Sequence, residues 1–280
     1  MLNRLAVLVL LLLAHAELGV SQQKPADRTI PMPVPTATKA QASAADFVGR
    51  AKELRGVIVQ IVAPTTGKIG SGFWVTDKGY VATCWHVVQD SPNAKFVVRT
   101  AVDPLFDLKK SNVVNANWQT FSADLVAQDE ENDLAVLKVA SNPFRQPPPV
   151  VIKLNDVHLS AHFERAALTE RLPEAGEKVF LAGYPLGQPY PVVQQGSVAS
   201  VAYDLPTFGS RVKILLSIVA NHGNSGGPVI DDKGKVVGIL EAGLPSTLPN
   251  IMDPAVAQSG IAVVVPSYFL VRLLNSKGIF

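Results

Sequence analysis

From residue 56 onward, hydrophobic and polar positions follow the pattern of short β-strands. Runs rich in Val, Ile and Leu, such as GVIVQIVA, YVAT and DLAVLKV, alternate with turn signals built from Gly, Asp and Pro. A second set of such runs follows residue 175 and includes KVFLAGY, VVQQGSVASV and KVVGIL. Many short strands at close spacing favour an all-β sandwich or barrel over alternating β and α units. Pro266 then opens the segment SYFLVRLLNS, which we expect to form a short C-terminal helix.

Two stretches lack this β pattern. Residues 21–52 place four prolines among Ala, Thr, Ser and Gln without a hydrophobic period, which predicts a flexible tether. Residues 141–175 are irregular and begin with a Pro-rich stretch, which predicts a linker between two β units. The first unit is therefore expected at about residues 53–142 and the second at about 172–280.

The first 20 residues have the pattern of a signal peptide. Arg4 precedes a short apolar run at residues 5–14, and Ala14-His15-Ala16 matches a small-x-small cleavage site. This apolar run is too short to span a bilayer, which takes about 20 residues. We therefore expect an exported protein, periplasmic or secreted, with no stable membrane insertion.

Composition narrows the class of protein. The chain is 48% apolar and 17% charged, which is typical of a compact globular protein. A net charge of +2 predicts no binding to nucleic acid. The single cysteine, Cys84, excludes an intramolecular disulfide. His158 and His162 are four residues apart, but neither an HExxH pattern nor a cysteine cluster accompanies them, so no metal site is expected.

The stretch NHGNSGGPV, residues 221–229, surrounds Ser225 with glycines. Because Gly reaches backbone conformations that other residues avoid, this cluster predicts a tight backbone whose N–H groups face a ligand. A simple hairpin connection is the alternative. His86 in VATCWHVV and Asp133 before LAVLKV would supply the base and the carboxylate that a nucleophilic serine needs. The nearby acidic residues that compete with Asp133 are Asp124, Asp129, Glu130 and Glu131.

The order His86, Asp133, Ser225 is that of the chymotrypsin-like enzymes and differs from the orders of α/β-hydrolases and subtilisins. With GSGFWVTDKGYVATCWHVV, NDLAVLKV and GNSGGPV, the chain resembles the trypsin-like serine endopeptidases, most of all their HtrA/Deg branch. The resemblance covers roughly residues 55–280, apart from a longer region between His86 and Asp133 and the irregular stretch 141–175. It implies an all-β, chymotrypsin-like fold of two six-stranded antiparallel barrels with the catalytic cleft between them.

The resemblance also implies roles for single residues. Ser225 would attack the scissile carbonyl, His86 would act as general base and then acid, and Asp133 would orient His86. The N–H groups of Gly223 and Ser225 would form the oxyanion hole. A small-to-medium apolar substrate pocket would be formed by Val219, Ala220, Gly238, Ile239 and Leu240, with Glu241 beside them. No cofactor is implied, the partners would be polypeptide substrates, and an oligomer is allowed.

The chain departs from the branch at two places. Cys84 stands where these enzymes usually have Ala or Asn, and the sequence ends at Phe280 with no length for a PDZ domain. A protease-like binding or scaffold module with a silent or activator-dependent site would share every motif above. A zymogen in which residues 17–50 must be removed is a third reading, less favoured because the HtrA branch does not activate in this way.

Overall fold

In the computed structural model, the described residues are 37–101, 106–107, 112–113, 118–145, 151–154, 157–159, 163–203, 211–245 and 258–280. Side chains are described for 47–101, 118–145, 163–203, 211–244 and 260–280. The expected signal peptide, residues 21–36 of the expected tether, and the side chains of His158 and His162 lie outside these ranges.

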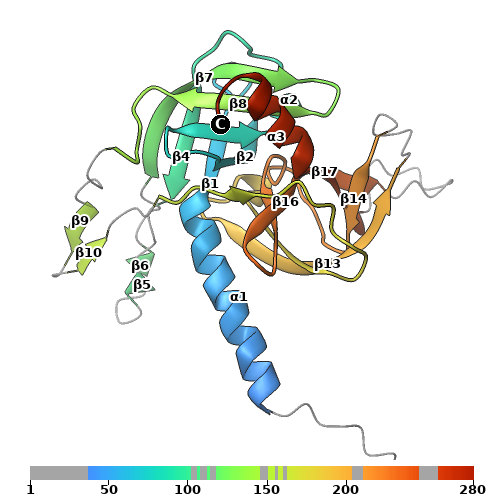
Figure 1. The fold of residues 1–280 in the computed structure, drawn as a ribbon. Helices are drawn as coiled ribbons and strands as arrows, with labels where there is room; N and C mark the ends of the chain where they lie inside the picture. Colours follow the sequence, from blue (N-terminus) through green and yellow to red (C-terminus); the bar gives the residue numbers. More distant parts are fainter. Residues whose placement is uncertain are drawn as a thin grey trace, which may run out of the picture.

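The first half of the chain forms a closed antiparallel barrel (Figure 1). Its strands are β1 (Ile58–Val62), β2 (Ile69–Trp74), β3 (Tyr80–Thr83), β4 (Phe96–Ala101), β7 (Trp118–Asp129) and β8 (Leu134–Val139). They lie in the order β1-β2-β3-β8-β7-β4, and pairing of β1 with β4 closes the ring. Two small ladders join β5 (Phe106–Asp107) to β6 (Asn112–Val113) and β9 (Val151–Leu154) to β10 (Val157–Leu159).

The second half forms another six-stranded antiparallel barrel. Its strands are β12 (Lys178–Gly183), β13 (Val192–Ala202), β14 (Lys213–Leu216), β15 (Pro228–Asp231), β16 (Lys235–Pro245) and β17 (Gln258–Pro266). Pairing of β16 with β17 closes this ring, and β11 (Ala167–Leu168) adds to β16 in parallel. Two short helical segments, α2 (Trp85–Val88) and the 3₁₀ turn η1 (Pro185–Gly187), precede α3 (Ser267–Ser276). The expected pair of six-stranded barrels and the C-terminal helix are confirmed.

The apolar core runs across the junction of the two barrels. Phe73 and Trp74 of the first barrel are fully buried, and Phe180 from the second barrel belongs to the same buried cluster. A separate cluster that includes Leu181 and Ile214 fills the second barrel. Because burial of apolar surface stabilises any arrangement that achieves it, the shared cluster holds the barrels together as one body. Loops from both barrels can therefore meet at a defined cleft.

Part of the expected tether is helical. α1 (Ala37–Val57) leads into β1 and projects from the barrels (Figure 1), so residues 37–52 do not form the predicted unstructured segment. The last proline of the segment is Pro35, and the Ala-rich sequence that follows favours a helix. The C-terminal turns of α1 also dock on the body, because Leu54 is buried and the Phe47 ring lies 6.0 Å from that of Phe180.

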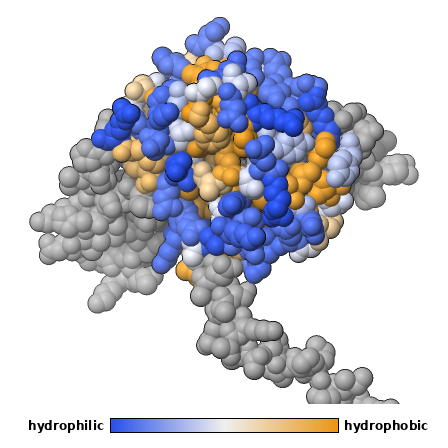
Figure 2. Space-filling model, viewed as in Figure 1, coloured by the Kyte–Doolittle hydropathy of each residue, from blue (hydrophilic) through white to orange (hydrophobic). Residues whose placement is uncertain are grey.

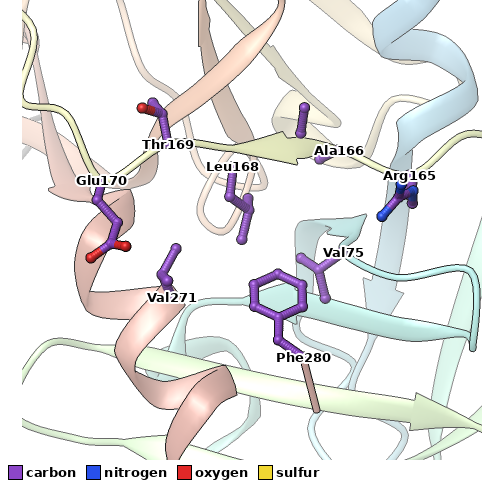
Figure 3. A pocket seen from close by; sticks show the side chains of 9 residues that line it. Val75, Arg165, Ala166, Leu168, Thr169, Glu170, Val271 and Phe280 are labelled. Carbon is purple, nitrogen blue, oxygen red and sulfur yellow. The ribbon is translucent and has the colours of Figure 1, made fainter.

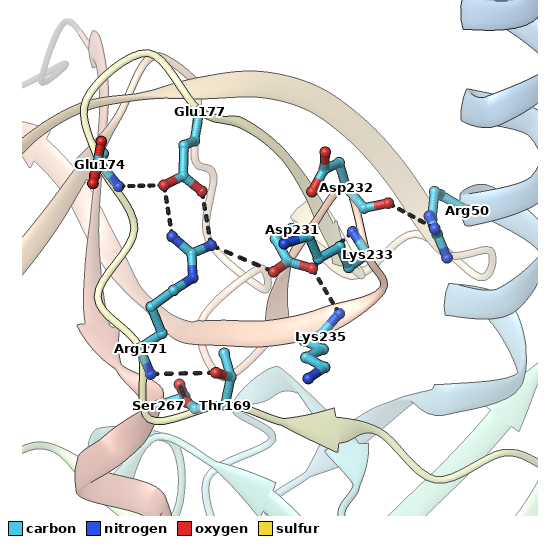
Figure 4. Close-up of polar contacts among 10 residues, drawn as sticks. All are labelled: Arg50, Thr169, Arg171, Glu174, Glu177, Asp231, Asp232, Lys233, Lys235 and Ser267. Atoms are coloured by element: carbon cyan, nitrogen blue, oxygen red, sulfur yellow. Dashed lines mark hydrogen bonds and ion pairs between the residues drawn. The ribbon is translucent and has the colours of Figure 1, made fainter.

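A polar network ties α1 to the second barrel (Figure 4). The Arg50 guanidinium donates to the Asp232 carbonyl oxygen at 2.6 Å. Behind it, Arg171 donates two hydrogen bonds to Glu177, at 2.6 and 2.7 Å, and reaches Asp231 at 3.5 Å. The Arg171 hydrogen bonds lower the pKa of Glu177 to about 2. Since this folded-state pKa is depressed, the pair stabilises the fold above the unfolded pKa of about 4.3, and this contribution is lost as pH falls toward 2.

Among the described residues, none of the helices combines the length and the apolar character that crossing a bilayer requires.

Candidate active site

Apolar side chains gather near the centre of the face in Figure 2, with polar residues around them. One cavity of about 640 Å³ is lined by Leu168 of β11, Val271 of α3 and the ring of Phe280, with Arg165 and Glu170 also in its wall (Figure 3). Its lining contains no serine, cysteine or histidine. This cavity therefore lacks the serine and the histidine that the predicted chemistry needs, and we do not assign that chemistry to it.

A second cavity, of about 410 Å³, contains both of these groups. Its lining includes His86 and Ser225, which come from different barrels, together with Gly223, Leu186 and Lys68. The elements explain this meeting, because His86 follows β3 of the first barrel and Ser225 lies in the loop before β15 of the second. The structure thus brings the predicted histidine and serine into one cleft.

Asp133 holds His86 through two hydrogen bonds. Its Oδ2 lies 2.7 Å from His86 Nδ1, and its Oδ1 accepts the His86 backbone N–H at 2.8 Å. The Asp133 carbonyl oxygen also accepts the Trp85 N–H at 3.1 Å. Because an ionised carboxylate has no proton to donate, Nδ1 carries the hydrogen and Nε2 stays free to accept one. Two of the competing acids have other partners: Asp124 pairs with Lys95, and Asp129 accepts hydrogen bonds from Asn132.

The backbone of Asp133 adopts a left-handed conformation, with φ of 54°. Asp and Asn tolerate this region better than most residues because their short polar side chains can hydrogen-bond locally. The carboxylate is mostly buried, with 15% of the side chain exposed, while that of His86 is 38% exposed. The dyad is therefore anchored on its acidic side and open on the side of the cleft.

The glycines around Ser225 shape a loop with two open N–H groups. Within the described part of the chain, the N–H groups of Asn224, Gly226 and Gly227 donate to backbone carbonyls, whereas those of Gly223 and Ser225 have no acceptor. Gly223 has a φ of 92°, and a Cβ placed there would lie 2.3 Å from the Tyr184 carbonyl oxygen. Only glycine fits this position, which explains why the sequence has one there.

The Ser225 hydroxyl points to the second barrel in this structure. Its Oγ donates to the Glu241 carbonyl oxygen at 3.0 Å. A hydroxyl carries one proton, so this hydrogen bond cannot coexist with donation to His86. The predicted catalytic residues are gathered in one cleft, with the Ser225 hydroxyl hydrogen-bonded to the backbone carbonyl of Glu241.

Cys84 adds a buried thiol beside the dyad. The ligand atoms of Cys84, His86 and Asp133 lie within 4.8 Å of one another, a spacing that suits a metal ion. However, burial raises the pKa of the Cys84 thiol well above its usual range, and the charges of Asp133 and Glu241 raise it further. Metals bind the thiolate, which this environment disfavours. The thiol instead donates to the Leu240 carbonyl oxygen at 3.2 Å.

The expected substrate-pocket residues fall into two groups. Val219 is 46% exposed, and Ala220 follows it in the loop before Ser225. Ile239 and Leu240 are 0% exposed in the barrel cores, and Gly238 is paired inside the sheet, so the expectation that these three line a surface pocket does not hold. Strand β16 leaves the core only after Leu240. The neighbour of Ala220 is Gly243, where an added Cβ would lie 3.2 Å from the Ala220 carbonyl oxygen.

Some cleft residues were absent from the expectations. Leu186, 67% exposed with a φ of 55°, and Lys68 both line the cavity. The Lys68 ammonium donates to the His86 carbonyl oxygen at 2.9 Å and to Asp90 at 2.8 Å. The Pro-Leu-Gly sequence around Leu186 gave a turn signal. Nothing local in the sequence marks Lys68, because its partners are distant in the chain.

Comparisons with known proteins agree with this geometry. Residues 70–239 match the family described as the trypsin-like peptidase domain. The serine protease Do-like HtrA of Lactobacillus helveticus is 27% identical over 71% of this chain and 39% of its own length. A probable periplasmic serine endoprotease DegP-like of Pseudomonas putida is 31% identical over 61% of this chain and 28% of its own. The chain thus spans well under half of either relative.

Solved structures show the same fold. The crystal structure of Deg5 superposes with a TM-score of 0.57 at 20% identity, covering 82% of this chain and 92% of that one. A serine endoprotease from Yersinia pestis gives a TM-score of 0.56 at 20% identity, covering 82% of this chain and 66% of that one. Since the family description covers more than half of the sequence, this chain belongs to the trypsin-like peptidases.

Proposed function

We propose that this protein is a serine endopeptidase of the HtrA type that hydrolyses peptide bonds of polypeptides through Ser225, His86 and Asp133. The observation that carries the proposal is the 2.7 Å contact between His86 Nδ1 and Asp133 Oδ2, in the same cleft as Ser225 and two open N–H groups. A base with a defined tautomer, a nucleophile and preorganised donors are the parts that acyl transfer needs.

The first chemical step is the attack of Ser225 on the scissile carbonyl. A rotation about χ1 takes the hydroxyl from the Glu241 carbonyl to His86 Nε2, which accepts the proton as the Oγ–C bond forms. The Gly223 and Ser225 N–H groups then donate to the carbonyl oxygen as it becomes negative. His86 returns the proton to the leaving amine, and Asp133 stabilises the intervening imidazolium. Water repeats the sequence to release the acyl group.

The substrate pocket is proposed between Val219 and Ala220 on one side and Ala242 and Gly243 on the other. Val219 is exposed, and Gly243 lies against Ala220. Small and apolar walls favour an apolar side chain of small or medium size. Export is proposed from the signal-like N-terminus, and the similarity to a probable periplasmic endoprotease of Pseudomonas putida supports a periplasmic location.

A binding module with a silent or activator-dependent site is the second candidate. The Ser225 hydroxyl bond to the Glu241 carbonyl favours it, since this resting geometry does not present the serine to its base. The two functions differ in the reactivity of Ser225, because an assembled site activates the serine whereas a silent one does not.

We expect a fluorophosphonate probe to label the wild-type protein covalently at Ser225. The probe reacts with a serine that has a competent base and oxyanion donors, so Ser225→Ala and His86→Ala should both lose labelling. Gel fluorescence followed by mass spectrometry of the modified peptide measures the result. If the wild type stays unlabelled even after an unfolded protein such as reduced casein is added, the binding module becomes the better description.

A further inference from the structure

The oxyanion loop, defined here as residues 221–227, is held by a residue of the other barrel. Ser71 lies in β2 of the first barrel and is fully buried. Its backbone N–H donates to the Ser225 carbonyl oxygen at 2.8 Å, and its Oγ donates to the Gly223 carbonyl oxygen at 2.6 Å. One side chain and its own backbone thus reach both residues whose N–H groups are open.

The peptide geometry makes these contacts consequential. A trans peptide is planar, with its C=O and N–H pointing in opposite directions, so each of these contacts fixes the N–H of the following residue, Asn224 or Gly226. The open N–H groups lie one peptide earlier, and Ser71 acts on them by restraining the backbone that follows them. The Gly223–Asn224 peptide is held at its oxygen by Ser71 and at its N–H by the Asn221 carbonyl, 3.0 Å away. The Ser225–Gly226 peptide is held by Ser71 at its oxygen and donates to the Leu240 carbonyl at 2.8 Å.

The Gly223 N–H needs such support from outside. It belongs to the peptide whose carbonyl, on His222, accepts the Leu186 N–H at 2.6 Å. Gly223 has no side chain to restrict its rotation, and its φ of 92° is one of several conformations open to glycine. The bond from Ser71 to the Gly223 carbonyl fixes the peptide that follows this flexible residue.

The Ser71 hydroxyl is itself oriented. Its Oγ accepts the Tyr184 N–H at 2.9 Å, so its one proton is left for the Gly223 carbonyl. The Ser71 carbonyl in turn accepts the Thr83 hydroxyl at 2.7 Å. Tyr184 opens the turn that contains Leu186, and Leu186 holds the preceding peptide. Ser71 therefore contacts the oxyanion loop directly, through the Gly223 carbonyl, and also holds the start of the turn whose Leu186 N–H binds the His222 carbonyl.

We infer that Ser71 is a positioning residue for catalysis. It holds the peptides that follow Gly223 and Ser225, restrains the backbone from which the two open N–H groups project, and does not contact the substrate. This inference rests on the proposed peptidase function. Removing one oxyanion donor typically costs about 10²–10³ in rate, and loosening a donor costs less. The Ser71→Ala protein should therefore react with a fluorophosphonate about 10- to 100-fold more slowly than the wild type.

The experiment measures the second-order labelling rate of the full chain with a fluorophosphonate-rhodamine probe between pH 6 and 9. Rates are divided by the folded fraction from urea unfolding. The matched control is Ser267→Ala, because Ser267 is also a buried serine whose Oγ donates to a distant backbone carbonyl, that of Thr169. This control should label within about twofold of the wild type, since neither residue lines the cleft.

The pH profile separates a positioning role from damage to the base. Ser71→Ala should lower the plateau of the labelling rate and leave its midpoint unchanged, because Ser71 does not contact His86 or Asp133. Ser71→Cys keeps the size and a weak donor, so its rate should fall between those of the wild type and Ser71→Ala. It also provides a test if the alanine variant unfolds.

The outcomes are distinguishable. Normal labelling of Ser71→Ala, or equal slowing in Ser267→Ala, would overturn the role of Ser71 and leave the peptidase function intact. A shifted midpoint would overturn it as well, since it would place the effect on the base. An unlabelled wild type would remove the proposed function, and the inference that rests on it would fall with it.

Discussion

Asp133→Asn is expected to lower kcat/KM for casein by about 10⁴-fold while the protein stays folded. The hydrogen bonds between Asp133 and His86 explain why the activity should fall. The His86 backbone N–H lies 2.8 Å from Oδ1 and requires an acceptor there, so the amide oxygen of asparagine must take that place. The amide NH₂ then faces His86 Nδ1 at the position of Oδ2. Nδ1 must become an acceptor, the ring proton moves to Nε2, and the imidazole can no longer take the serine proton.

Asparagine is the informative replacement at this position. The φ of 54° suits Asn almost as well as Asp, whereas alanine would add backbone strain. The matched control is Asp124→Asn, another nearby carboxylate, which pairs with Lys95 at the surface and should leave kcat/KM within about twofold. Casein turnover and thermal unfolding of both variants provide the measurements. An Asp133→Asn protein within tenfold of the wild type would show that another acid orients His86.

Among the proposed substitutions, Lys213→Met is expected to lower the free energy of unfolding the most. Lys213 is buried at 2% side-chain exposure and donates to Glu241, itself 13% exposed, at 2.6 Å. Removing one partner of a buried pair leaves an uncompensated charge, which typically costs about 3–5 kcal/mol. Methionine has a similar length and no charge, so the loss reports on Glu241 more than on packing. Urea unfolding measures it.

The pH dependence identifies Glu241 as the cause. Burial already raises the pKa of Glu241 despite the opposing Lys213, and without Lys213 the carboxyl must take up a proton to stay inside. Its folded pKa is then far above the unfolded value of about 4.3, so the cost is small below that pH and grows as pH rises. At 1.36 kcal/mol per unit, the upper limit is about 1 kcal/mol at pH 5 and about 5 kcal/mol at pH 8.

A double variant tests this assignment. Lys213→Met with Glu241→Gln removes both charges and should abolish the pH dependence, although a buried amide without a partner still carries some cost. A loss in Lys213→Met that is equal at pH 5 and pH 8 would contradict the assignment and indicate a packing defect. Both variants are compared with the wild type at each pH, so that the titration of other groups cancels.

Much of the fold, and the grouping of His86, Asp133 and Ser225, could be predicted from the sequence by itself. Short apolar runs bounded by turn signals, such as the run YVAT before His86, specify strands, which is a local property of the sequence. The glycines around Ser225 likewise mark a backbone that only glycine adopts, and the structure shows it at Gly223. The choice of Asp133 among five neighbouring acids depended on family order, and the hydrogen bonds to His86 now single it out.

Only the tertiary structure determined the contacts between residues that are far apart in the chain. The Ala-rich segment before Val57 forms a helix, supported by docking of Leu54 and Phe47 that no local pattern reports. Ile239 and Leu240, which were expected to line the substrate pocket, are buried, because the point where β16 leaves the core depends on its neighbours. Ser71 and Gly223 are 152 positions apart, and their hydrogen bond exists only because closure of two barrels brings them together. Sequence patterns carry local conformation and chemistry, whereas the partners of a buried polar group are set by the packing of the whole chain.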